Sequence, residues 1–181
     1  LKLGKGLDLD YTWAEWEGNR YAFGDDCLTL NRQGIDRHMG AARYGGEHHR
    51  SLTAYGLARL GVKSGSVDLT LTVPPALYND LKQPVIDAYS KTPVVIKLKG
   101  DKTPREWRYE TVSIWPEGFA AVGCFMFDAQ GGKSALAGKL AGDIVLLDCG
   151  AYTANVFRLN NGKFNPADLP HSSIQNGGGN T

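Results

Sequence analysis

The chain has 181 residues, of which 42% are hydrophobic, and 20 basic against 19 acidic residues give a formal net charge of +1. A chain of this size buries about 70% of its unfolded surface, so it can form a core without disulfides or metals. The balanced charge argues against a general nucleic-acid binder, which usually carries a strongly basic face, so we expect no direct contact with nucleic acid.

The cysteine pattern and the hydropathy exclude two further classes. The three cysteines lie far apart, in no C-x-x-C spacing and in an odd number, at Cys27, Cys124 and Cys149. This pattern suggests neither a disulfide framework nor a zinc site, and it favours a cytoplasmic protein. No apolar run approaches the roughly 20 residues that span a bilayer, so we expect no membrane contact.

The sequence of the first half of the chain predicts four elements. They are a β-hairpin over 11–23, a helix over 47–60, a strand over 67–73 and a helical stretch over 77–89. The hairpin has aromatic residues on both sides of a turn at Glu17-Gly18-Asn19. The first helix has apolar residues near helical spacing and ends at Gly61. Pro84 predicts a kink or a second helix start in the second helical stretch.

The second half predicts a hairpin over 93–98 and 106–115, a helix that opens near Glu117, a surface loop over 130–142, a buried strand over 144–147 and a hairpin strand over 154–159. The apolar run of the buried strand is typical of a strand covered on both faces. Hairpins interspersed with helices indicate a mixed α/β sheet.

The segment 147–153 is a candidate phosphate-binding turn. An apolar strand delivers Asp148 into a turn of small residues, and Thr153 follows. Gly150 and Ala151 let backbone N–H groups approach phosphate oxygens, Asp148 can hold a hydrated Mg²⁺, and the Thr153 hydroxyl can donate to phosphate. An ordinary hairpin turn has the same composition, so both interpretations stay open at this point.

Glu117 is a second candidate. It lies between Pro116 and Gly118 at a strand-to-helix junction, where a carboxylate can orient a water molecule for attack. Acidic residues also favour the first turn of a helix because of the helix dipole, and this explanation competes with the catalytic one.

Two tempting motifs fail on inspection. Gly132-Lys133-Ser134 ends like a Walker phosphate loop, but Phe127 stands where the first glycine of that loop belongs. His48 and His49 are adjacent, so they cannot face one metal from the same side of a helix.

Three stretches, taken in chain order, carry a resemblance to a known family. They are T-V-P-P-A-L-Y at 72–78, W-P-E-G-F-A-A at 115–121 and D-C-G-A-Y-T-A-N-V at 148–156. Together they resemble the actin-like ATPase superfamily, which includes actin, sugar kinases and heat-shock chaperone ATPases, and most closely its ParM-type plasmid-segregation actins. They are similar to that type's GLP-x-x-x-Y strand end, to the segment whose Glu or Gln positions the hydrolytic water, and to the second phosphate loop, D-x-G-x-x-T-x-D-V. Tyr152 replaces a common Gly of this loop, and Asn155 replaces its second acid.

The resemblance implies an α/β fold of the actin-like, or ribonuclease H-like, type: a mixed sheet with flanking helices that forms one lobe of a two-lobed ATPase. It implies that 1–181 is most of the first domain, without the first phosphate hairpin and the second domain. The small peripheral subdomain is then expected within about residues 1–50. A fragment of this kind is expected to bind ATP weakly or not at all.

The resemblance also implies ATP and Mg²⁺ as ligands, self-association into filaments and a DNA-bound adaptor protein as partner. Glu117 would orient the attacking water, and Asp148 would hold Mg²⁺ through water. Gly150, Ala151 and Tyr152 would offer backbone N–H groups to the phosphates, and Thr153 its hydroxyl.

Two alternatives remain at this stage. A non-polymerising ATPase or small-molecule kinase of the superfamily would share Asp148 and Thr153 without forming filaments. A non-catalytic actin-like scaffold would explain the altered positions Tyr152 and Asn155 as signs of lost catalysis.

Overall fold

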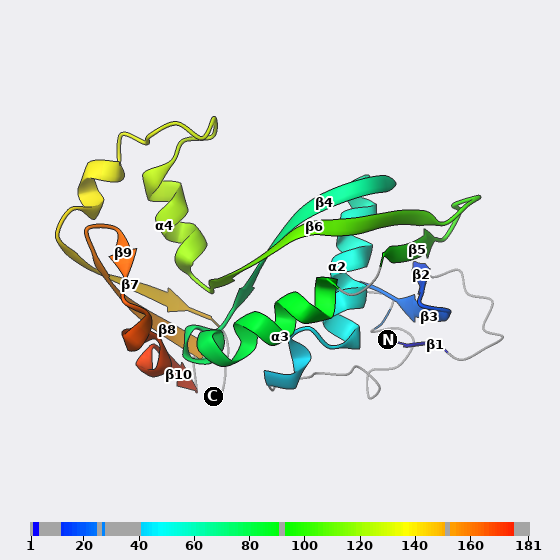
Figure 1. Cartoon of the computed structure of the whole chain (residues 1–181), viewed down its shortest axis with the longest axis horizontal. Coiled ribbons are helices and arrows are strands. Elements are labelled where there is room, and N and C mark those ends of the chain that lie inside the picture. Colours follow the sequence, from blue (N-terminus) through cyan, green and yellow to red (C-terminus); the bar gives the residue numbers. More distant parts are fainter. Residues whose placement is uncertain are drawn as a thin grey trace. The chain divides into compact units, whose positions relative to one another are not determined.

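The computed structural model describes residues 2–3, 12–24, 27, 41–90, 93–150 and 153–175 (Figure 1). The chain divides into two units: unit 1 contains residues 1–69 and 84–113, and unit 2 contains residues 70–83 and 114–181.

A six-stranded sheet begins in unit 1. Its strand order is β1 (Lys2–Leu3), β3 (Asn19–Ala22), β2 (Trp13–Trp16), β5 (Val94–Leu98), β6 (Arg105–Pro116) and β4 (Ser64–Val73). The β2–β3 hairpin confirms the first prediction, because Glu17 and Gly18 form its turn with φ values of 47° and 72°. Positive φ at both central residues is the requirement of a tight hairpin turn, and it matches the twist of the two strands.

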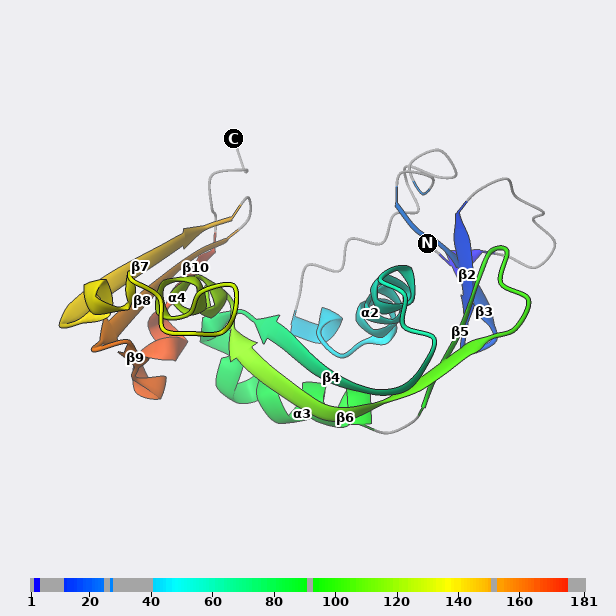
Figure 2. The ribbon, with the colours of Figure 1, turned by 90° about the horizontal axis from the view of Figure 1, so that it is seen from above.

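The sheet is mixed. The β5 and β6 strands pair antiparallel. The β4 and β6 strands run in the same direction (Figure 2): the Glu106 N–H donates to the Lys63 carbonyl at one end, and the Glu117 N–H donates to the Val73 carbonyl at the other. Residue numbers therefore rise together along both strands, as in a parallel pair.

Helix α2 (Glu47–Arg59) packs against the unit 1 sheet. Its small buried residues, Ala54 and Ala58, lie in one core cluster with large side chains of the strands, namely Trp16, Tyr21, Ile96 and Trp107. The helix ends as predicted, since Gly61 follows with a φ of 100°. A short 3₁₀ turn, η1 (Ala41–Arg43), precedes it.

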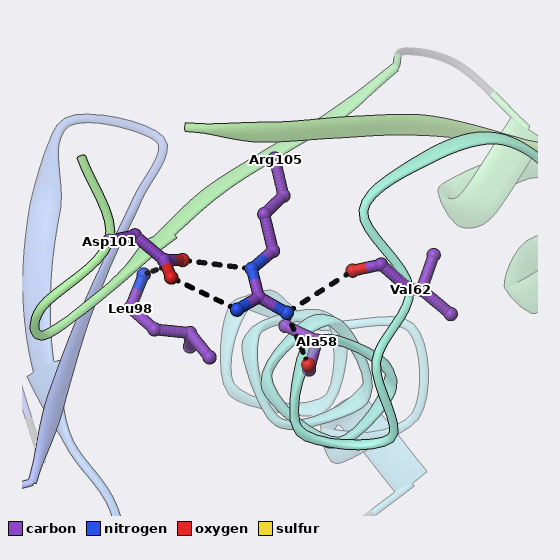
Figure 3. A network of polar contacts seen from close by, with 5 residues as sticks. All are labelled: Ala58, Val62, Leu98, Asp101 and Arg105. Carbon is purple, nitrogen blue, oxygen red and sulfur yellow. Dashed lines mark hydrogen bonds and ion pairs between the residues drawn. The ribbon is translucent and has the colours of Figure 1, made fainter. Parts of the chain in front are cut away.

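Arg105, the first residue of β6, ties the β5–β6 turn to the C-terminal end of α2 (Figure 3). Its Nε donates to Asp101 Oδ2 at 2.8 Å, and its Nη2 donates to Asp101 Oδ1 at 3.0 Å. Its Nη1 donates to the Ala58 carbonyl at 2.6 Å and to the Val62 carbonyl at 3.4 Å. The guanidinium thus adds a second donor to the Ala58 carbonyl at the helix end, which also accepts from the Gly61 N–H at 3.1 Å.

Unit 2 contains a second, four-stranded sheet with the order β10 (Ser173–Gln175), β8 (Thr153–Asn160) and β7 (Asp143–Cys149), and β9 (Lys163–Phe164) pairs with β8. Helix α4 (Phe119–Met126) covers one face of this sheet (Figure 2). Val122 of α4 and Leu159 of β8 are buried together with Leu140 of η3 (Ala137–Leu140). Two further 3₁₀ turns are η2 (Pro75–Leu77) and η4 (Pro166–His171).

One alternative is excluded and one prediction needs correction. Of the two alternatives for Pro84, a kink or a second helix start, the second is excluded, because Pro84 lies inside helix α3 (Tyr78–Ser90). In β7 the outward side chains Val145 and Leu147 are 70% and 62% exposed, so the prediction of a strand buried on both faces is wrong for the described structure. The reason is the alternation of side chains along a strand, because α4 covers only the other face.

Candidate functional site

Glu117 lies on the turn between β6 and α4. Its backbone N–H donates to the Val73 carbonyl at the end of β4 at 2.8 Å, and the side chain is half-buried. Gly118 follows as the N-cap of α4 with a φ of 84°, and α4 has no acidic residue in its first turn. Glu117 therefore lies one residue before the N-cap, outside the first turn of the helix.

The second candidate residue of the site, Asp148, lies near the end of β7. It is half-buried and stands directly opposite Asn155 of β8. Gly150 is exposed, and Thr153 is the first residue of β8. Ala151 and Tyr152 lie outside the described residues, so their expected part in the turn stays a prediction.

Gly118 brings these two parts together. A Cβ atom at position 118 would lie 2.8 Å from Cε2 of Phe157 and 3.3 Å from Oδ2 of Asp148. The close approach and the positive φ both require glycine here. The structure thus places the turn that carries Glu117 against the carboxylate of Asp148, although the two residues belong to distant segments of the sequence.

A buried polar row continues from Asp148 into the sheet. Asn155 is 2% exposed, and its Oδ1 accepts a hydrogen bond from Ser173 Oγ at 2.9 Å. The same Oγ accepts from the Ala76 N–H at 3.3 Å. The resemblance pointed to Asn155, but strand β10 and the hydrogen bond from Ser173 to Asn155 were not predicted.

The donor set around Asp148 fits a magnesium ion that arrives with phosphate. Within the described ranges, no group of three or more His, Cys, Asp or Glu side chains could hold a metal ion. Mg²⁺ is typically held by one or two carboxylates, substrate phosphates and water molecules, and not by an all-protein cage. A single carboxylate beside a glycine turn agrees with that mode.

In the Walker-like segment at 132–134 and just before it, backbone N–H groups donate to the Asp128 side chain. Oδ1 of Asp128 accepts hydrogen bonds from the backbone N–H groups of Gln130 and Gly132, at 3.0 Å and 2.7 Å. A phosphate loop needs such N–H groups to face its ligand. Asp128 therefore stabilises a surface turn at this position, in agreement with the rejection of the motif.

His49 belongs to the packing of unit 1. Its Nδ1 accepts from the Gly45 N–H at 3.1 Å and lies 2.9 Å from the hydroxyl of Tyr89. Burial, and to a smaller extent the charge of Arg43, lower the pKa of His49, which keeps Nδ1 available as an acceptor.

Among the helices that the structure describes, none is long and apolar enough to cross a membrane.

No family model matches the sequence, and no curated protein matches it either. Solved structures do match. An AlfA filament bound to AMPPNP has a TM-score of 0.69 at 19% identity, covering 99% of this chain and 60% of its own. An apo psk41 ParM protein has a TM-score of 0.66 at 16% identity, and the match covers 96% of this chain and 54% of the ParM chain.

An archaeal actin homologue, Ta0583, is also similar, with a TM-score of 0.64 at 17% identity and a coverage of 96% of this chain and 51% of its own. The chain therefore spans between about half and three fifths of the length of these structures. At such identities the likeness concerns the fold.

Proposed function

We propose that this chain, which has the actin-like fold, is part of an ATP-binding, filament-forming protein that segregates plasmid or phage DNA by ATP-driven polymerisation. The observation that carries the proposal is the approach of Gly118 to Asp148, which joins the Glu117 turn to the end of β7. The similarity to AlfA, whose structure is a filament bound to AMPPNP, supports nucleotide binding and self-association.

The β7–β8 turn would hold the phosphates. Gly150, Ala151 and Tyr152 would direct backbone N–H groups to the phosphate oxygens, and Thr153 would donate its hydroxyl. Asp148 would hold Mg²⁺ through a water molecule. The ion, when bound, neutralises charge that develops on the phosphates.

Glu117 would act on the attacking water. From the turn before α4, its carboxylate would accept a hydrogen bond from that water and align the oxygen with the γ-phosphorus. Phosphoryl transfer depends mostly on such positioning and on electrostatic stabilisation. The hydrogen bond between the Glu117 N–H and the Val73 carbonyl fixes the backbone from which this side chain extends.

The assembly proposal has two parts. The chain would contribute most of the first domain of the protein, with the small peripheral subdomain within about residues 1–50. A DNA-bound adaptor would connect the filament to its cargo, because the balanced net charge of +1 argues against a general nucleic-acid binder.

The test is Glu117→Ala in the natural full-length protein. Loss of a residue that positions the nucleophile is expected to slow phosphate release about 100-fold or more while ATP-dependent pelleting persists. Glu110→Ala, which removes an exposed carboxylate in unit 1, is the matched control and should leave the rate unchanged. Unchanged turnover in Glu117→Ala would contradict the assigned role.

Two other outcomes would overturn more of the proposal. ATP hydrolysis without pelleting or light scattering would indicate a non-polymerising ATPase or kinase. The absence of any phosphate release from the full-length protein would indicate an actin-like scaffold without catalysis.

A further inference from the structure

Three polar side chains form a row across the unit 2 sheet and end at Asp148. Ser173 of β10 pairs with Asn155 of β8, and Asn155 pairs with Asp148 of β7. Residues that are directly opposite on neighbouring strands share one face of the sheet, with Cβ atoms about 5 Å apart. The row therefore connects Ser173 with the carboxylate that we assign to Mg²⁺.

The hydrogen bonds give the row a direction. The Ala76 N–H donates to Ser173 Oγ, and the Ser173 hydroxyl donates to Asn155 Oδ1. Strand β8 lies between β10 and β7, so an amide oxygen directed to β10 leaves the amide nitrogen on the β7 side. In this orientation the N–H donors of Asn155 would face the side on which Asp148 lies.

The charge of this position matters because Asn155 is 2% exposed. An aspartate here would place a second carboxylate opposite Asp148, and like charges that face each other across a strand pair are destabilising. An asparagine removes one negative charge and supplies donors instead. An oxygen of the Asp148 carboxylate or of a phosphate can accept from such a donor.

We propose that Ser173 and Asn155 are positioning residues for Asp148, and that they hold an amide N–H donor, in place of a second carboxylate, beside the oxygens that would carry Mg²⁺. The inference rests on the proposed function for the role of Asp148. It adds the group that fixes the orientation of the Asn155 amide, which is the hydroxyl of Ser173. This hydroxyl is held in turn by the backbone N–H of Ala76 in η2.

The orientation can be measured by NMR on the unaltered 181-residue chain. We expect nuclear Overhauser contacts from the Nδ2 protons of Asn155 to the Hβ protons of Asp148. Contacts to the Hβ protons of Ser173 in their place would show the opposite amide orientation and overturn the proposal. This measurement needs no variant and no bound nucleotide.

Variants test whether Ser173 sets that orientation. In Ser173→Ala we expect the Nδ2 protons of Asn155 to exchange with water at least tenfold faster, and in Ser173→Thr, which keeps a hydroxyl, we expect near-normal exchange. Ser90→Ala is the control, because the exposed Ser90 hydroxyl bonds within its own helix, to the Ile86 carbonyl. Unchanged exchange in Ser173→Ala would contradict the role of the hydroxyl.

A Mn²⁺ titration separates positioning from stability. Line broadening at the Asp148 amide reports Mn²⁺ beside this residue, and we expect Asn155→Asp to bind Mn²⁺ about tenfold more tightly because a second carboxylate is added. Equal affinity in Asn155→Asp would contradict the charge argument. Absence of broadening in the unaltered chain would show that Asp148 does not hold the metal without phosphate, and the amide orientation would still be decided by the Overhauser contacts.

Discussion

Arg105 illustrates, at the scale of one residue, how much a half-buried charge depends on its partners. Its side chain is 17% exposed and bonds Asp101 and the Ala58 carbonyl. In Arg105→Ala the Asp101 carboxylate loses its cationic partner and the Ala58 carbonyl loses one of its two donors, and we expect a loss of about 2–3 kcal/mol in the free energy of unfolding. In Arg158→Ala the loss should stay within about 0.5 kcal/mol, because its pair with Asp143 is exposed. Urea denaturation measures the free energy of unfolding of both variants, and equal losses in the two would contradict the prediction.

The same pair predicts a pH dependence. Hydrogen bonds from Arg105 are the main cause that lowers the pKa of Asp101 in the folded chain. A lowered folded-state pKa stabilises the fold above the unfolded pKa of about 3.9, and this stabilisation is lost as the pH falls through the folded-state pKa.

The measurement is the urea midpoint of the unaltered chain and of Asp101→Asn between pH 7 and pH 3. We expect the difference between the two proteins to be constant above about pH 5 and to shrink as the pH falls further. A difference that is the same at pH 7 and pH 3 would show that the charge of Asp101 does not stabilise the fold.

The sequence was informative about the chemistry of single residues and silent about their neighbours. Asp148 and Glu117 were found because a carboxylate after a strand or before a helix has a recognisable context. The importance of Gly118 was not predictable, since it depends on the ring of Phe157, which another strand brings to 2.8 Å from the missing Cβ position. The hydrogen bond from Ser173 to Asn155 was missed for the same reason.

At the scale of elements, local signals predicted those structures that are decided locally. The β2–β3 hairpin and α2 have their turn and capping residues within the segment itself, and both are confirmed. Strand β10 has only three residues, and it exists because β8 pairs with it. The two faces of β7 could not be separated either, because an apolar run does not say which layers are present around a strand.

Leu159 and Val145 test the face assignment of the β7–β8 hairpin. Leu159 is 1% exposed and packs with Val122 and Leu140, whereas Val145 is 70% exposed. We expect Leu159→Ala to lower the free energy of unfolding by about 2–4 kcal/mol through the lost contacts and the cavity. Val145→Ala should change it by no more than about 0.5 kcal/mol.

Urea denaturation of both variants decides the matter. A large loss in Val145→Ala with a small loss in Leu159→Ala would mean that the inward and outward faces are exchanged. A register shift of one residue has that effect, because it moves every side chain to the opposite face.

At the scale of the whole molecule, the order of several loose motifs predicted the fold better than any single motif did. The actin-like fold is confirmed at identities of 19% and below for the three structures compared above. Packing constrains residue types only loosely at most positions, so sequences diverge while the arrangement of strands and helices persists. What remains a proposal is chemistry, because fold alone does not determine function.

The last prediction concerns the affinity of the isolated chain for ATP. The chain spans 60% of the length of the matching AlfA structure, and under our proposal it carries one of two phosphate loops and none of the adenosine pocket. Ligand sites usually bury 70–90% of a small molecule, and a site with half of its walls buries much less. We therefore expect a dissociation constant for MgATP of about 100 μM or weaker, equivalent to roughly −5.5 kcal/mol.

Isothermal titration calorimetry of the 181 residues with MgATP measures this constant, and Asp148→Ala in the same chain is the control for a specific site. Weak binding that Asp148→Ala abolishes would agree with a partial site centred on the β7–β8 turn. Sub-micromolar binding would mean that these residues form a complete nucleotide pocket by themselves. In that case the proposal of a single lobe of a two-lobed ATPase is wrong, because the second lobe would have nothing left to contribute to binding.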